Sequence, residues 1–163
     1  MKKIHYNWQQ VQGACLDIAR QMSNHYWRPD YIVGIGRGGL IPANLLSQYT
    51  GIKMNSLDIS LRDGGDCVSN CGMSEDAFEG KKILIVDDIN DQGSTVAWIK
   101  EDWQSNALPS HPNWSTIWGD TVRFAFLTHN ISSQFKDPDY HVWTVNKAEE
   151  DCWLVYPWEE FWL

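Results

Sequence analysis

Short apolar runs alternate with helix-like segments, and this alternation limits the fold more than any other feature of the sequence. The runs that read as strands are "YIVGI" (31–35), "KMNSLDISL" (53–61), "ILIV" (83–86), "VRFAFL" (122–127), "YHVWTV" (140–145) and "CWLVY" (152–156). Helical spacing or capping signals fall between several of them, and such alternation implies a mostly parallel sheet with helices on both faces. Ligands of these sheets bind beyond the carboxyl ends of the strands.

Three helices are predicted from periodicity and end signals. Asn7 is the expected N-cap of the first helix, and one face of that helix carries apolar residues, namely Trp8, Val11, Cys15, Ile18 and Met22. The second covers residues 40–49, with Pro42 near its first turn. The third begins at Ser94 as its cap, and its apolar face consists of Val96, Ile99 and Trp103.

The stretch "LIVDDINDQGST" (84–95) carries the strongest chemical signal. Residues 84–86 end a buried strand, and Asp87, Asp88 and Asp91 follow close together. Like charges at such short separation repel unless a cation or a set of hydroxyl groups holds them. The alternative is an acidic turn that is simply solvated.

The residues after the acids favour a phosphate ligand. Gly93, Ser94 and Thr95 supply backbone N–H groups and two hydroxyls at the start of a helix, where the unpaired amides and the helix dipole favour an anion. Gly93 allows the backbone to approach closely, while Asp87 and Asp88 can accept hydrogen bonds from vicinal hydroxyls. Together the stretch predicts a site for a ribose 5-phosphate.

Three motifs resemble those of one enzyme family. "ILIVDDINDQGST" (83–95) resembles the phosphoribosyl-pyrophosphate signature of type I phosphoribosyltransferases, with Gln92 in place of the usual Thr. "GIGRGGL" (34–40) resembles the pyrophosphate loop of that family. "DCWLVYPWE" (151–159) resembles the C-terminal tail of its bacterial and archaeal hypoxanthine, guanine and xanthine enzymes. The resemblance implies an α/β fold with a mostly parallel sheet flanked by helices and a small hood from the chain termini.

Two other families share parts of these motifs. Gly34, Gly36 and Gly39 satisfy the dinucleotide pattern G-x-G-x-x-G, and Asp58 stands near the end of the next strand. That interpretation leaves residues 87–95 without a role. The pattern D-D-x-x-D of prenyl-diphosphate enzymes also matches, but those enzymes are larger and all-helical, whereas the acids here follow a strand.

The resemblance assigns roles to the sugar-phosphate residues. Ribose and its 5-phosphate would contact Asp87, Asp88, Asp91, Gln92, Gly93, Ser94 and Thr95. Pyrophosphate would bind Arg37, Gly38 and Gly39, in a loop where a non-proline cis peptide is expected near Gly36–Arg37. The cofactor would be Mg2+, with Asp88 as its protein ligand. Asp91 would exchange a proton with the purine N7, or would alternatively cap the following helix.

The same resemblance places the base at the C-terminal segment, residues 147–163. Trp153 would stack on the purine and the Leu154 backbone would bond its edge, although plain core packing is the alternative for Trp153. Relatives carry a Lys after the strand that matches "VRFAFL", and it donates to the 6-oxo group. This chain reads Thr128, His129 and Asn130 there, so His129 or Asn130 is the expected donor.

The remaining segments are a long loop and an insertion within one domain spanning residues 1–163. The loop, about 62–80, has no period and several glycines, so we expect a lid over the site. Arg62 would contact the substrate on closure, or is an exposed solubilising residue. A metal or redox role for Cys67 and Cys71 stays open. The insertion, about 106–120, reads as irregular.

Composition excludes some functions. Lys and Arg total 13 against 21 Asp and Glu among 163 residues, and the net charge of −8 disfavours general affinity for nucleic acid or anionic membrane. The N-terminus has no apolar signal region, and no run approaches the roughly 18 apolar residues of a membrane span. A cytoplasmic protein with reduced thiols is expected, and we expect a homodimer or higher homo-oligomer.

The predicted function is therefore transfer of the 5-phosphoribosyl group from phosphoribosyl pyrophosphate to hypoxanthine, guanine or xanthine in purine salvage. The alternative is a non-catalytic regulator of the same fold that binds phosphoribosyl pyrophosphate or a nucleotide. Retention of Asp91 and the lack of a basic cluster favour the enzyme.

Overall fold

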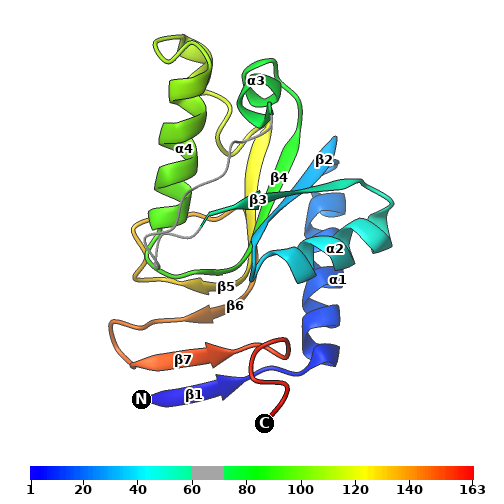
Figure 1. Ribbon diagram of the computed structural model, residues 1–163, viewed down its shortest axis with the longest axis vertical. Coiled ribbons are helices and arrows are strands. Elements are labelled where there is room, and N and C mark those ends of the chain that lie inside the picture. The colour runs from blue at the N-terminus through cyan, green and yellow to red at the C-terminus, as the bar shows by residue number, and fades with distance from the viewer. Residues whose placement is uncertain (60–71) are drawn as a thin grey trace.

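A computed structural model describes residues 1–59 and 72–163, and its central feature is a five-stranded parallel sheet (Figure 1). The strand order is β3-β2-β4-β5-β6, with β2 at Tyr31–Gly36, β3 at Met54–Asp58, β4 at Ile83–Asn90, β5 at Val122–Asn130 and β6 at Tyr140–Val145. All four neighbouring pairs are parallel. The α/β class predicted from the alternation is confirmed. Arg62, Cys67 and Cys71 lie outside the described residues.

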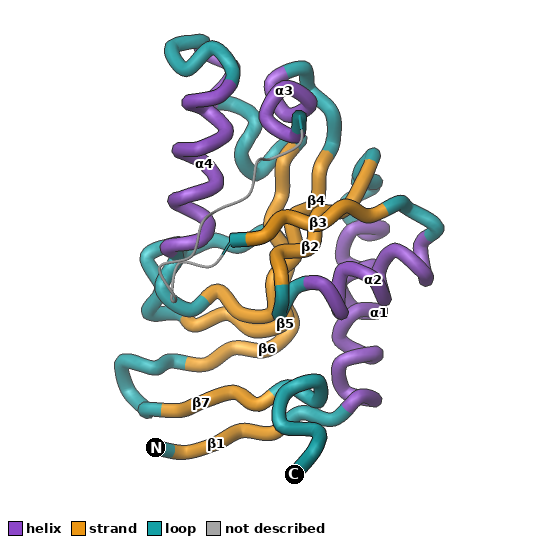
Figure 2. The backbone as a smooth tube through the Cα atoms, viewed as in Figure 1, coloured by secondary structure: helices purple, strands orange, loops and turns teal. Residues whose placement is uncertain are grey.

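Helices cover both faces of the sheet (Figure 2). The helices α1 (Trp8–Asn24) and α2 (Leu40–Thr50) pack on one face, and α3 (Met73–Phe78) and α4 (Ser94–Asn106) pack on the other. Asn7 caps α1 in a reciprocal box, because its Oδ1 accepts from Gln10 N and its N–H donates to Gln10 Oε1, both at 2.8 Å. The predicted apolar face of α1 is buried except for Trp8, which is 46% exposed.

Several element boundaries differ from the sequence-based expectation. The strands β4 and β5 extend to Asn90 and Asn130, because their parallel ladder continues to the pair Asn90–His129 and keeps polar residues in the sheet. Part of the predicted long loop is helix α3, and α4 begins after Gly93, so that Ser94 is its first residue and not its cap. Strand β1 (Lys2–His5) was not predicted, since it is short and polar.

The two chain ends form the small hood implied by the resemblance. Strand β1 pairs in parallel with β7 (Cys152–Val155), and both termini lie beside this pair (Figure 1). A stack of aromatic rings joins the hood to the sheet: Tyr6 lies 4.1 Å from the Trp143 ring and 5.5 Å from the Tyr156 ring, centroid to centroid. Trp158 stacks on Tyr156 at 4.9 Å.

The insertion at 106–120 folds against the α4 face of the sheet. It contains a short 3-10 helix, Pro112–Ser115, and Trp114 Nε1 donates to Ala107 O at 2.7 Å. Trp118 lies 6.0 Å from Trp114 and 6.1 Å from Trp103, so the indoles form one packed group. Trp103 and Trp114 are thus core residues, and Trp98 and Trp118 pack against that core. No helix in the described ranges combines the length and apolar character that crossing a membrane requires.

Trp103 tests this packing. Its side chain is fully buried, and its Nε1 has no hydrogen-bond partner within residues 1–59 and 72–163. Trp103→Ala should lower the free energy of unfolding by about 3–5 kcal/mol, whereas Trp103→Phe should cost much less because it keeps an aromatic ring and removes an unsatisfied N–H. Urea denaturation of both variants measures the difference. Equal losses would show that a phenyl ring cannot replace the indole in this packing.

Candidate active site

Two acids lie within the last residues of β4 and face the loop after β2. Asp87 Oδ1 accepts from Asp88 N, and Asp88 Oδ1 accepts from Ile89 N, each at 2.8 Å. The second oxygen of Asp88 points towards Gly38, because a Cβ placed on Gly38 would collide with it. The acidic strand end and the predicted pyrophosphate loop therefore lie in contact.

The loop after β2 depends on glycine for this contact. The peptide bond Gly36–Arg37 is cis, as the resemblance implied. A Cβ on Gly39 would collide with the Val86 carbonyl and lie 2.8 Å from Ile35 O. Arg37, by contrast, is exposed. Its guanidinium can thus reach an anionic ligand while the two glycines keep the backbone beside the acids.

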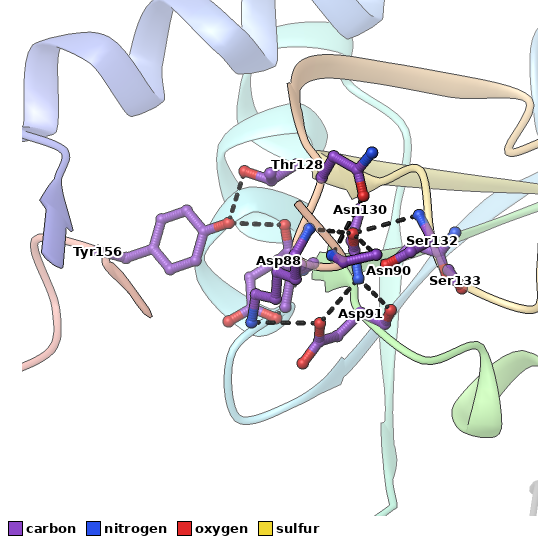
Figure 3. Close-up of polar contacts among 12 residues, drawn as sticks. Asp88, Asn90, Asp91, Thr128, Asn130, Ser132, Ser133 and Tyr156 are labelled. Carbon is purple, nitrogen blue, oxygen red and sulfur yellow. Dashed lines mark hydrogen bonds and ion pairs between the residues drawn. The ribbon is translucent and has the colours of Figure 1, made fainter. Parts of the chain in front are cut away.

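The Asn130 carboxamide joins Asp91 to two other turns (Figure 3). Asn130 is 4% exposed, and its Nδ2 donates to Asp91 O at 2.8 Å and to Asp91 Oδ1 at 3.3 Å. Its Oδ1 accepts from Ser132 Oγ at 2.8 Å and from Lys147 N at 3.0 Å. Asn130 is therefore a connecting residue whose donors are directed at Asp91.

Lys147 forms an ion pair with Asp91. Its Nζ lies 3.2 Å from Asp91 Oδ1, and both side chains are 19% exposed. The same Nζ lies 5.5 Å from the centroid of the Trp153 ring. Sequence reasoning searched for a lysine after β5 and missed this one, which follows β6. The usable signal was its place two residues beyond a neighbouring strand that ends at the same edge of the sheet.

Asp91, Lys147 and Trp153 share a cavity of about 640 Å³. Three segments and the N-terminus line the cavity. The residues are Asp91, Gln92 and Ser94 after β4; Asn130 at the end of β5 with Ser132 and Gln134 after it; Lys147, Ala148, Asp151, Cys152 and Trp153 before and within β7; and Met1. Trp153 is 40% exposed, so its ring is available to a ligand. The cavity brings the predicted phosphate turn and the predicted stacking residue together.

The phosphate turn ends at the start of α4. Gly93 is the N-cap with φ +87° and, as a glycine, supplies no side chain to cap the helix. The first-turn amides of a helix attract an anion. A Cβ on Gly93 would lie 2.7 Å from Phe135 N. The glycine is required by packing of the protein itself, in addition to the predicted approach of a phosphate.

His129 and Leu154 are not among the residues that line the cavity. The His129 ring is buried, and its Nδ1 lies 3.0 Å from Asn90 Nδ2, which also donates to Phe135 O at 2.8 Å. Because a carbonyl only accepts, the Asn90 amide must present its N–H groups here, and His129 Nδ1 is the acceptor. Burial lowers the pKa of His129, and nearby His141 adds to the effect. The Leu154 side chain is in the core, and its backbone pairs with Ile4.

The carboxylates of Asp87 and Asp88 fit a divalent cation that takes most of its ligands from water and substrate. No group of three or more His, Cys, Asp or Glu side chains suited to a metal exists in the described ranges. Mg2+ commonly uses one or two carboxylates, with the rest of its shell from water and substrate phosphates. Asp88, which contacts the pyrophosphate loop, and adjacent Asp87 meet that requirement.

The parallel sheet, the terminal hood and the acidic end of β4 together define a type I phosphoribosyltransferase fold. Comparison with known proteins agrees with the geometry. A family model described as a phosphoribosyl transferase domain matches residues 4–158, and the chain belongs to this family.

Two purine phosphoribosyltransferases and one hypothetical protein are among the similar proteins. The hypoxanthine-guanine phosphoribosyltransferase of Schizosaccharomyces pombe is 24% identical, covering 96% of this chain and 89% of that protein. A purine phosphoribosyltransferase from Pyrococcus horikoshii has a TM-score of 0.68 at 27% identity, covering 99% of this chain and 96% of the other. A hypothetical protein from Neisseria gonorrhoeae, solved with bound ppGpp, has a TM-score of 0.71 at 23% identity, covering 97% and 89%.

Burial of neutral His129 predicts a pH dependence of stability. In the folded state its pKa is lowered, so below about pH 6.5 the unfolded chain binds a proton that the folded chain does not. The free energy of unfolding should therefore fall as the pH decreases through that value. Urea denaturation at about pH 7.5 and about pH 5.5 measures the fall, which should be smaller in His129→Gln. His5→Gln, at an exposed site, is the control; an identical fall in both variants would remove His129 as the cause.

Proposed function

We propose that the protein transfers the 5-phosphoribosyl group of phosphoribosyl pyrophosphate to a purine base, namely hypoxanthine, guanine or xanthine, with release of pyrophosphate. The observation that carries the proposal is the cavity, whose lining combines residues of the phosphate turn with Asp91 and Trp153. The relatives are purine phosphoribosyltransferases by name, which supports the choice of base class.

The residues divide the substrate between them. Ser94, Thr95 and the first amides of α4 bind the 5-phosphate, as anions bind at helix N-termini. Asp87 and Asp88 accept from the ribose hydroxyls, and Arg37 with the Gly38 and Gly39 amides binds the pyrophosphate. Asp88 would hold Mg2+, which would supply positive charge beside the leaving pyrophosphate.

Asp91 acts on the base. A purine that attacks C1 of the ribose through an imidazole nitrogen develops positive charge and must give up or relocate a proton. A carboxylate beside that nitrogen stabilises the charge and accepts the proton. Asp91 lines the cavity, and its backbone carbonyl oxygen accepts a hydrogen bond from Asn130 Nδ2. Its place in the cavity lining supports a chemical role.

The direct test is to incubate the protein with phosphoribosyl pyrophosphate, Mg2+ and hypoxanthine, guanine or xanthine, and to measure the release of pyrophosphate. Nucleotide formation with any of them supports the proposal. Binding of phosphoribosyl pyrophosphate without turnover of any base would instead support a non-catalytic regulator. A protein of similar fold has been solved with ppGpp bound, and such a role is compatible with that structure.

We also propose that the protein is cytoplasmic and forms a homodimer or higher homo-oligomer. Light scattering measures the oligomeric state.

Asp91→Asn should lower kcat by about 10²–10⁴-fold, because the change keeps the shape and removes the base. The affinity for Mg2+-phosphoribosyl pyrophosphate should be retained. Steady-state kinetics and calorimetry measure the two quantities. Asp120→Asn, at an exposed site before β5, is the matched control. Near-normal turnover of Asp91→Asn would remove Asp91 as the catalytic residue.

Trp153→Ala should raise KM for the base by about 5- to 150-fold and barely change affinity for phosphoribosyl pyrophosphate, since stacking contributes roughly 1–3 kcal/mol per base. Trp162→Ala removes an exposed indole near the C-terminus and is the control. Equal losses of affinity for both substrates would identify Trp153 as a packing residue.

A further inference from the structure

We propose that Asn90 and Ser133 are positioning residues for the 5-phosphate. They hold the segment after β5, residues 131–136, in the shape against which the phosphate turn, residues 91–95, is packed. This inference rests on the proposed function and adds two residues that act on the ligand through their neighbours, since neither is among the residues that line the cavity.

The phosphate turn lies directly against the segment after β5. Gln134 N donates to Gln92 O at 3.1 Å. A Cβ built on Gly93 would lie 2.7 Å from Phe135 N and 3.1 Å from Ser133 Oγ. The Gly93 backbone therefore has no space between itself and these two residues, and its place depends on theirs.

A buried carboxamide determines the shape of the segment after β5. Asn90 is 2% exposed and Ser133 is 1% exposed. Asn90 Oδ1 accepts from Ser133 Oγ at 2.9 Å, and Asn90 Nδ2 donates to Phe135 O at 2.8 Å. Ser133 Oγ also accepts from Phe135 N at 3.2 Å. The hydroxyl and the carboxamide thus close a ring of hydrogen bonds around residues 133–135.

His129 fixes the orientation of this carboxamide. Its Nδ1 accepts from Asn90 Nδ2 at 3.0 Å, so the amide nitrogen of Asn90 serves His129 and Phe135 and its oxygen is left for Ser133. The Phe135 ring lies 5.5 Å from the Phe124 ring, centroid to centroid, which anchors the segment to the sheet. A buried network with its members paired in this way favours a single arrangement.

The direction of the amides matters for an anion at a helix N-terminus. Amide N–H groups bind a phosphate well only when they point at its oxygens. Gly93 precedes Ser94, the first residue of α4, and its φ of +87° sets the direction in which the helix begins. Because Asn90 and Ser133 hold Gly93 in place before a ligand binds, less free energy is spent on ordering the turn.

Ser133→Ala tests the assignment, because it removes one hydroxyl and leaves the residues of the cavity lining unchanged. Calorimetry should show about 10-fold weaker affinity for ribose 5-phosphate, the size of one hydrogen bond to a charged group. The affinity for Mg2+-pyrophosphate should be unchanged. Ser47→Ala is the matched control: it removes a serine hydroxyl that donates to Ile52 O near the end of α2, and should leave both affinities unchanged.

Asn90→Ala shows whether the two residues act together. Because both reach Gly93 through the same ring of hydrogen bonds, the double variant should bind ribose 5-phosphate no more weakly than Asn90→Ala alone. Additive losses would overturn the joint role. Far-UV circular dichroism establishes that each variant is folded, and if Asn90→Ala is not, the two affinities of Ser133→Ala decide the question.

Binding of ribose 5-phosphate requires no base, which separates this inference from the proposed function. A wild-type protein that binds ribose 5-phosphate and turns over no base contradicts the proposed activity alone. The inference is overturned by an unchanged affinity of Ser133→Ala for ribose 5-phosphate, by an equal fall in its affinity for Mg2+-pyrophosphate, or by failure of the wild-type protein to bind ribose 5-phosphate.

Discussion

The parallel pairing of β4 with β5 is the constraint on which the site depends. Because the ladder continues to the pair Asn90–His129, Asn130 lies beside the turn that carries Asp91. Its carboxamide can then bind Asp91 O and Lys147 N at once. A shift of this register by one residue would turn Asn130 to the opposite face of the sheet and separate the acid from the cation. The chemistry proposed for the cavity is therefore a consequence of strand register.

A second constraint is the set of contacts that joins the hood to the carboxyl ends of β4 and β5. Tyr156 OH donates to Asp88 O at 3.0 Å and shares a 2.8 Å hydrogen bond with Thr128 Oγ1 (Figure 3). Burial raises the pKa of this phenol well above its usual 10, so it stays protonated and remains a donor. Stacking of Tyr6 on Tyr156 and Trp143 extends the connection to β1 and β6. The wall that carries Trp153 is thus tied to the strand that carries the acids.

Local sequence patterns predicted the features that depend on neighbouring residues. The alternation of apolar runs predicted the parallel sheet, Asn7 as the expected N-cap predicted where α1 starts, and the sequence from Asp87 to Thr95 predicted a turn at a strand end. The site was harder, because its contacts join residues far apart in sequence. The ion pair links Asp91 to Lys147, and the burial of His129 depends on the turn that contains Phe135. No periodicity or motif encodes such contacts.

The net charge of the chain bears on how this acidic protein would bind the proposed polyanionic substrate, phosphoribosyl pyrophosphate. The chain carries a net charge of −8, and two of its acids stand together at the end of β4. A substrate with phosphate at both ends would be repelled from them unless a cation arrived with it. The described residues offer no cluster of three metal ligands, so the ion is best held when substrate oxygens complete its shell. The −8 charge then favours the metal-loaded substrate over the bare anion. Around the proposed base position the balance differs, because Lys147 already compensates Asp91, and the proposed uncharged purine would enter a site whose two charges cancel.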